Sequence, residues 1–251
     1  VYAVFAFTDA ERERELKRWQ QRLGIVADSR LADVEAWIGT QLAVMHDLAE
    51  NGSLQLYLSV LSEGDTSADT AEASYLRNLL TVVAQREKFA PDIAPVVAFV
   101  VPIFDVQADV TTDPPIGRVL GVKTAAPELF ARLKQPGSVD RTAEALLVQR
   151  DGAGVVYLSP QADGTAPLVR RLAEDTPDLA ASFALKSPGG FARKRDYDDT
   201  EVLVTSRAID GVPWGLLYKV DVAEALAESE SRIRQIGIAF LLIIGLVLIG
   251  M

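Results

Sequence analysis

Apolar residues recur three and four positions apart from about Thr8 to Ala49, and no proline interrupts them. This spacing predicts one long amphipathic helix, which at about 1.5 Å per residue would extend roughly 60 Å. The apolar stripe is offset between Val26 and Leu31, where Arg30 takes an apolar position. We therefore expect the buried face of the helix to change partner there. One candidate partner is the same helix of a second subunit, which predicts a homodimer through this helix.

Helical spacing returns in Leu54 to Leu61 and again in Ala71 to about Phe89, on either side of a polar loop. After Pro91 the composition becomes rich in β-branched and aromatic residues. This change predicts strands at Pro95 to Phe104 and at Gly117 to Val122, followed by a short helix at Glu128 to Leu133.

The second half of the chain has the pattern of an antiparallel sheet. EALLVQR, the turn residues DGAG and VVYLS follow each other from Glu144, which predicts a β-hairpin. Two further strands are expected at Glu201 to Ala208 and Trp214 to Val220, each with one face on the core. Short helices are expected at Pro167 to Leu172 and Pro177 to Leu185, and a last helix begins at Val222.

Both ends of the sequence are apolar. Ile236 to Met251 contains no charged residue, and Val1 to Phe7 is apolar before a charged segment begins at Asp9. Each stretch is shorter than the roughly 20 residues that cross a bilayer, so we interpret them as parts of two transmembrane helices. The alternatives are a buried core helix at the C-terminal end and the remnant of a signal peptide at the N-terminal end.

Composition narrows the possible functions. The net charge of −10 disfavours binding to nucleic acid. The chain has no cysteine and one histidine, His46, so neither a transition-metal site nor a Ser-His-Asp triad is expected. We predict no cofactor and no catalytic residue in this segment.

Two stretches carry a resemblance to a known family. ALLVQRDGAGVVYLSP and RDYDDTEVLVTSRAIDGVPWGLLYKVDVAEAL resemble the hairpin, the acidic turn and the closing strand of double Cache (PAS-like) sensor domains. The resemblance is strong from Ala143 and weak from Pro91 to Asp140. It implies an α+β fold with a long N-terminal stalk helix and two stacked PAS-like antiparallel-sheet modules, flanked by transmembrane helices.

The domain boundaries expected from this resemblance are as follows: the end of a first transmembrane helix at 1–8, the stalk and further helices at 9–90, a divergent membrane-distal module at 91–140, a membrane-proximal module at 141–222, and a linker helix running into the second transmembrane helix at 223–251.

The resemblance also implies a function. Such domains sense ligands in the periplasm, here over about residues 9–232, and control a cytoplasmic histidine kinase, diguanylate cyclase or chemoreceptor. The amino-acid-binding members use a Tyr, Arg, Trp and Asp constellation in the distal module, which Tyr75, Arg77 and Arg86 do not reproduce. The alternative is a membrane-tethered module that binds a protein partner or dimerises and has no small-molecule ligand.

A small organic ligand, for which a carboxylate is the natural candidate, requires cationic donors beside aromatic walls. Six residues of the second half supply these groups, namely Tyr157, Arg170, Arg171, Tyr197, Arg207 and Trp214. The competing interpretation assigns these residues no contact with a ligand. In it, Arg170 and Arg171 are solvated residues of a helix, Ala192 to Arg195 form a surface loop, and Trp214 anchors the core. Asp196, Asp198 and Asp199 lack calcium-loop spacing and are expected to form a solvated turn.

Overall fold

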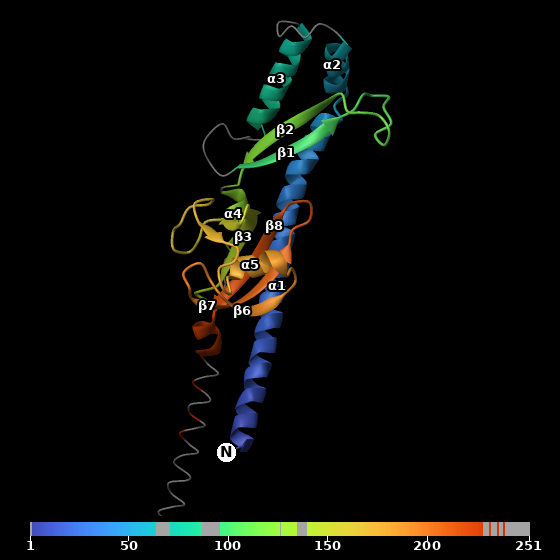
Figure 1. The fold of residues 1–251 in the computed structure, drawn as a ribbon. Coiled ribbons are helices and arrows are strands. Elements are labelled where there is room, and N and C mark those ends of the chain that lie inside the picture. The colour runs from blue at the N-terminus through green and yellow to red at the C-terminus, as the bar shows by residue number, and fades with distance from the viewer. Residues whose placement is uncertain are drawn as a thin grey trace, which may run out of the picture. The chain divides into compact units, whose positions relative to one another are not determined.

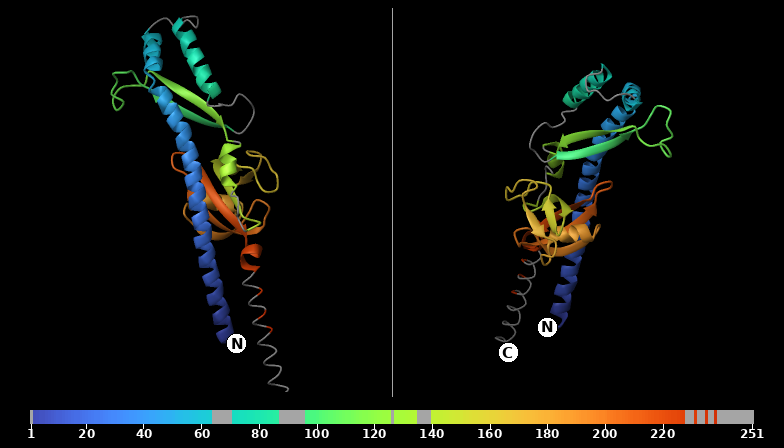
Figure 2. Two further views of the ribbon diagram at one scale, coloured as in Figure 1. Left: turned by 180° about the vertical axis from the view of Figure 1, so that it is seen from behind. Right: turned by 45° about the horizontal axis from the view of Figure 1, so that its top comes forward.

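The computed structural model describes residues 2–63, 71–86, 96–125, 127–134 and 140–227, together with 231, 235 and 238. The chain divides into two compact units: Val1–Ala32 with Leu133–Met251 form unit 1, and Asp33–Arg132 form unit 2. Figure 1 labels most of their elements, and Figure 2 shows the same elements from two further sides.

The long N-terminal helix is present as α1, Tyr2–Ala49, and contributes to both units. The boundary between the units follows Ala32, two residues after the break that Arg30 makes in the apolar stripe. Leu23 and Ala27 are buried before the boundary, and Val34 and Trp37 after it. The buried apolar positions of α1 are thus covered within the chain, whereas Val26 and Leu31 are half-buried and Ile25 is exposed.

Unit 2 combines helices with a small sheet. Helices α2 (Gly52–Glu63), α3 (Ala71–Arg86) and α4 (Glu128–Leu133) accompany an antiparallel pair, β1 (Val96–Ile103) and β2 (Gly117–Thr124). A two-stranded sheet is marginal alone, so it depends on packing against helices. Trp37 of α1 supplies such packing, because its ring lies 6.0 Å from that of Phe99 and its Nε1 donates to Glu128 Oε2 over 3.4 Å.

Unit 1 contains a six-stranded antiparallel sheet in the order β5-β4-β3-β8-β7-β6. Its elements are β3 (Glu144–Asp151), β4 (Gly154–Tyr157), β5 (Arg171–Ala173), α5 (Ala180–Lys186), β6 (Phe191–Arg195), β7 (Glu201–Ala208) and β8 (Trp214–Asp221). The expected hairpin is confirmed as β3 and β4, and the two later strands as β7 and β8. The first strand and the last strand of this sheet are neighbours at its centre.

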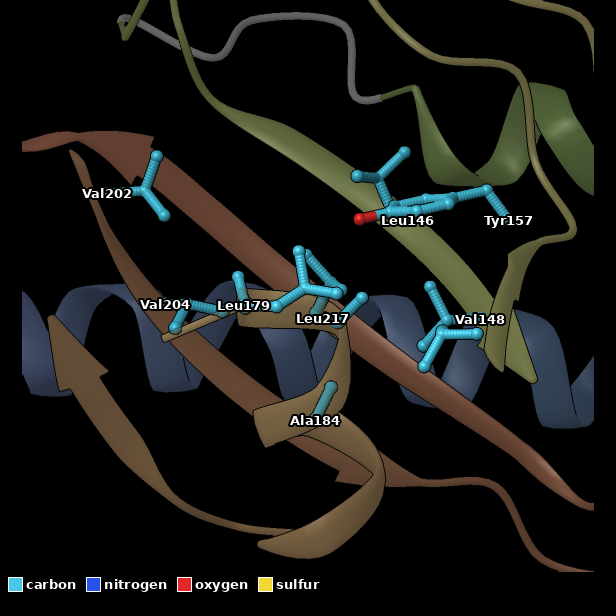
Figure 3. Packing of buried hydrophobic residues seen from close by; sticks show 11 residues of the cluster. Leu146, Val148, Tyr157, Leu179, Ala184, Val202, Val204 and Leu217 are labelled. Atoms are coloured by element: carbon cyan, nitrogen blue, oxygen red, sulfur yellow. The ribbon is translucent and has the colours of Figure 1, made fainter. Parts of the chain in front are cut away.

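The central strands of this sheet are buried on both faces. One face packs on α5 through a cluster that includes Leu146, Val148, Val204 and Leu217 (Figure 3). The other face is covered by the first part of α1, where Trp19 Nε1 donates to the carbonyl of Ala225 over 2.9 Å. Burial is accordingly continuous over residues 202–206 and 215–220, so the expectation that each of these strands has only one face on the core was wrong: the helix α1 covers the second face.

Two further local expectations were wrong. Residues 167–172 are not a helix: Leu168 has a left-handed backbone with φ of 66°, and Arg171–Ala173 form the edge strand β5. Ala192 to Arg195 belong to the other edge strand, β6, and not to a surface loop. Pro167 and the dense positive charge favoured a loop or a helix start from the sequence, but edge strands commonly carry charged residues, which oppose pairing with another chain.

The coarse fold class is confirmed: the protein is α+β, with a long N-terminal helix and antiparallel sheets. Within the described part of the chain, no helix has both the length and the apolar character needed to cross a membrane. The expected second span, 236–251, lies outside the described residues apart from Ile238, and the expected end of the first span begins α1. The helix expected from Val222 is present over residues 222–227.

Candidate functional site

Two charged residues occupy core positions at one end of the sheet of unit 1. Side chains alternate along a strand, so Glu144 faces the same way as Leu146, and Lys219 the same way as Leu217. The two residues are also register partners on adjacent strands. Lys219 Nζ lies 2.9 Å from Glu144 Oε2, and it forms a second ion pair with Asp196. All three side chains are almost fully shielded from solvent, at 6%, 11% and 1% exposed in that order.

Two tyrosines extend this charged group toward β4. The ring of Tyr157, which is 0% exposed, meets that of Tyr197 edge to face at 5.8 Å. The hydroxyl of Tyr197 donates to Glu144 Oε2 over 3.0 Å. Arg170 Cζ and Lys219 Nζ lie 4.4 and 4.6 Å from the centre of the Tyr197 ring, so two cations contact this aromatic side chain.

The connection between β4 and β5, residues 158–170, supplies the remaining polar groups. Arg170 Nη2 donates to Asp163 Oδ2 over 2.6 Å and to Thr165 Oγ1 over 3.1 Å. Gln161 is buried in the same connection. The left-handed Leu168 belongs to it as well, and its N–H donates to the carbonyl of Tyr157 over 2.8 Å. A non-glycine residue in this conformation costs about 1 kcal/mol or more, so surrounding contacts must hold it in place.

We name this group the polar cluster. It comprises seven residues from five segments: Glu144, Tyr157, Gln161, Arg170, Asp196, Tyr197 and Lys219.

Four buried polar atoms of the cluster have no hydrogen-bond partner among the described residues. They are the donors Tyr157 Oη and Arg170 Nη1 and the acceptors Gln161 Oε1 and Asp196 Oδ1. Buried polar groups in folded proteins are nearly always satisfied, and each one left unpaired costs about 1–3 kcal/mol. The cluster therefore presents two donors and two acceptors that an ordered water or a small polar ligand could satisfy.

Burial controls the protonation of these groups. It raises the pKa of Asp196 to about 6, because desolvation outweighs the attraction of the Lys219 ammonium. Burial alone would lower the pKa of Lys219, but the carboxylates of Asp196 and Glu144 together outweigh it and raise that pKa. Burial, followed by the charge of Asp196, also raises the pKa of Tyr157. At neutral pH Tyr157 is thus a neutral donor and Lys219 a cation, an arrangement suited to binding.

Of the six residues predicted as ligand contacts, Tyr157, Arg170 and Tyr197 come together, and three others lie elsewhere. Arg171 points outward from edge strand β5 and pairs with Asp151. Arg207 and Trp214 lie on the opposite face of the sheet, as strand alternation requires.

Arg207 and Trp214 have partners on that face or at its edge. Arg207 Nε is 2.5 Å from Asp28 Oδ1 of α1, so this arginine ties the helix to the sheet. Trp214 Nε1 donates to Gln149 Oε1 over 3.1 Å.

Sequence reasoning missed Glu144 and Lys219, and it placed Asp196 in a solvated turn. The turn interpretation holds for Asp198 and Asp199, which are exposed, whereas Asp196 is buried. Strand alternation could have found Glu144 and Lys219, since a charge in phase with core leucines must be paired to be tolerated. Among the described residues no group of acidic and histidine side chains is arranged to hold a metal ion.

No known family model matches this chain, and the search of curated proteins found no match either.

Proposed function

We propose that the chain is the extracytoplasmic ligand-sensing segment of a bacterial membrane receptor, and that its ligand binds at the polar cluster of unit 1. The observation that carries this proposal is the set of unpaired donors and acceptors on Tyr157, Gln161, Arg170 and Asp196. A sensor histidine kinase or a diguanylate cyclase is the proposed output, as the resemblance to double Cache domains implies, with a chemoreceptor as the third option.

The topology of unit 1 supports this assignment. Its first and last strands, β3 and β8, are central neighbours, with β4 beside one and β7 and β6 beside the other. The helical crossing between the two hairpins, α5, packs on one face of the sheet. The PAS-like resemblance implies this arrangement, in which the final strand lies at the centre and leads directly out of the module.

The charges of the site favour a neutral ligand. Within the polar cluster the carboxylates of Glu144 and Asp196 balance the cations Arg170 and Lys219, and Asp163, which pairs with Arg170 beside the cluster and is 39% exposed, adds one further negative charge. A carboxylate ligand would bring a negative charge that no remaining cation of the cluster balances, and an unbalanced charge is costly in a buried setting. We therefore propose a small neutral molecule bearing hydroxyl or amide groups, with the carboxylate suggested by the sequence as the alternative.

A direct covalent path leads from the cluster toward the C-terminal end. Lys219 lies on β8, and the helix at residues 222–227 begins immediately after that strand. Within this helix Glu224 accepts hydrogen bonds from the backbone N–H groups of Arg141 and Thr142, both 2.9 Å long. Suppose that β8 can adopt two placements relative to the rest of unit 1. A ligand that binds the protein more tightly in one placement would move β8 and the helix that follows it, and only such a difference in affinity can drive signalling.

The test is a thermal-shift screen of the full chain against polyols, amides and small carboxylates. A ligand at about 100 times its dissociation constant should stabilise the protein by roughly 2.7 kcal/mol. Tyr157→Phe removes an unpaired buried hydroxyl, so it should leave the ligand-free melting temperature unchanged or raised while it reduces the shift. Tyr218→Phe is the matched control, because Tyr218 is also buried but faces away from the cluster.

Each result of the screen bears on the proposal. A shift from neutral polar compounds that Tyr157→Phe weakens and Tyr218→Phe preserves would support it. A shift from carboxylates alone would replace the ligand class. If neither class shifts the melting temperature, the sensing role is refuted in favour of a partner-binding module.

A further inference from the structure

Unit 2 contains a cavity of about 370 Å³ that is separate from the polar cluster. It is formed by the end of α1, both helices that follow, the last residue of β1, and strand β2. Met45 and Leu54, which line it, are almost fully buried, whereas Leu80 on α3 and Leu120 on β2 are exposed. The cavity therefore has a closed interior and an open side, and its size is within the range of about 300–1,000 Å³ that small-molecule sites occupy.

The lining is apolar with one exception. Leucine, valine, isoleucine, methionine and glycine account for it, and Arg118 is the one charged residue among the lining residues that the structure describes. Along β2, Val119 and Gly121 are buried while Arg118 and Leu120 are exposed, as strand alternation requires. Arg118 therefore lies on the exposed face of β2, the same face as the exposed lining residue Leu120.

We propose that this cavity binds an unbranched aliphatic monocarboxylate, with its hydrocarbon chain inside and its carboxylate at Arg118. The apolar walls offer no hydrogen bonds to a polar ligand, so the buried part of the occupant must be apolar. One arginine at the mouth complements one negative charge, and its planar guanidinium suits a carboxylate. This proposal concerns unit 2 alone and does not depend on the sensing role of the polar cluster.

Because the chain has no cysteine, a single introduced thiol gives a local measurement on the full chain. Leu80→Cys places a thiol on the open side of the cavity, and the rate of its modification by a maleimide should fall as octanoate fills the cavity. Val82→Cys is the matched control: it lies on the same helix and is exposed, but it does not line the cavity. Its rate should not respond to octanoate.

Chain length and charge are then varied separately in the Leu80→Cys protein. From butyrate to octanoate, the concentration that half-protects the introduced thiol should fall by up to about fourfold per methylene, the value for burial of one CH₂ group. Adding Arg118→Gln should raise that concentration for octanoate about threefold to fivefold, because the lost ion pair is partly exposed. The same change should leave protection by octan-1-ol unaltered.

The possible results are distinct. Absence of protection by octanoate, or equal protection of the control thiol, would overturn the assignment of the cavity as a binding site. Equal loss of octanoate and octanol protection in Arg118→Gln would overturn the role of Arg118 as the anion contact. Failure of the polar ligand screen would leave these measurements unaffected, because they report on unit 2.

Discussion

Lys219 holds two buried carboxylates, and its removal is the most direct test of the polar cluster. Lys219→Met keeps most of the side-chain volume but leaves Glu144 and Asp196 without their shared cation. Breaking a buried ion pair from one side costs about 3–5 kcal/mol, because the remaining charge stays buried without compensation. At about 2–4 °C per kcal/mol for a chain of this size, the melting temperature should fall by roughly 6–20 °C.

The measurement is urea unfolding followed by tryptophan fluorescence. Trp37 lies in unit 2, so a Trp37→Phe background confines the fluorescence to unit 1, where Trp19 and Trp214 are located. Lys194→Met is the matched control. Lys194 Nζ lies 2.7 Å from Asp178 Oδ1, but Asp178 is 65% exposed, so this pair should contribute about 1 kcal/mol or less.

The pH dependence sharpens the test. Without Lys219 the two carboxylates are protonated more readily, so the cost of Lys219→Met should shrink between pH 7 and pH 5. The combined change Lys219→Met with Asp196→Asn should recover part of the loss, because it removes one of the two uncompensated charges. A cost no larger than that of Lys194→Met, unchanged by pH, would refute the argument that the cluster depends on Lys219.

Three further predictions follow from individual groups of unit 1. The pKa of Asp196 is raised from 3.8 to about 6, so between about pH 4 and pH 6 the native state holds a proton that the unfolded state has lost, and the free energy of unfolding falls as pH rises through this range. Asp196→Asn should remove this fall, worth about 2–3 kcal/mol, from the pH profile of urea unfolding. Hydrogen bonds from Thr142 and Arg141 lower the pKa of Glu224 from 4.5 to about 2, so the stabilisation from this carboxylate is present above pH 4.5 and is lost as pH falls toward 2. Glu224→Gln should therefore reduce the loss of stability at acid pH by about 1–2 kcal/mol, as measured by acid titration followed by circular dichroism. Gly190→Ala should cost about 1–3 kcal/mol in thermal unfolding, because the added Cβ would lie 2.7 Å from Phe183 Cζ; an unchanged melting temperature would show that this packing relaxes.

The sequence predicted most elements of the fold because their patterns are local. The 3.6-residue spacing of α1 and the turn residues between β3 and β4 depend on neighbours in the chain, and both elements are present. The edge strand β5 was missed because its partners in β4 lie 15 or more positions earlier in the chain, whereas β6 pairs with the next strand, β7, and was missed because its charged run shows no apolar face. Three residues of β5 cannot carry a detectable period of two.

The site was only half predictable for a related reason. Aromatic and cationic residues identified Tyr157, Arg170 and Tyr197, but nothing local distinguishes Arg170 from Arg171. The two differ because Arg170 turns inward to the Tyr197 ring, while Arg171 lies outward on the edge strand. Arg207 and Trp214 could have been separated from the others, since strand alternation places them in phase with residues on the α1 face.

Stability does not account for a charged group at the end of this core. A buried ion pair seldom adds net stability, because desolvation offsets the attraction, and apolar residues of similar volume serve as well or better. The same sheet shows that such residues fit, since Leu146 and Leu217 occupy the next positions on the same face. Four polar atoms left unpaired add to the cost of the cluster. Polar atoms that are unpaired in the free protein and gain partners in a complex favour binding, and under the proposed sensing role a ligand that pairs them better in one of two arrangements of the protein would shift the equilibrium toward that arrangement.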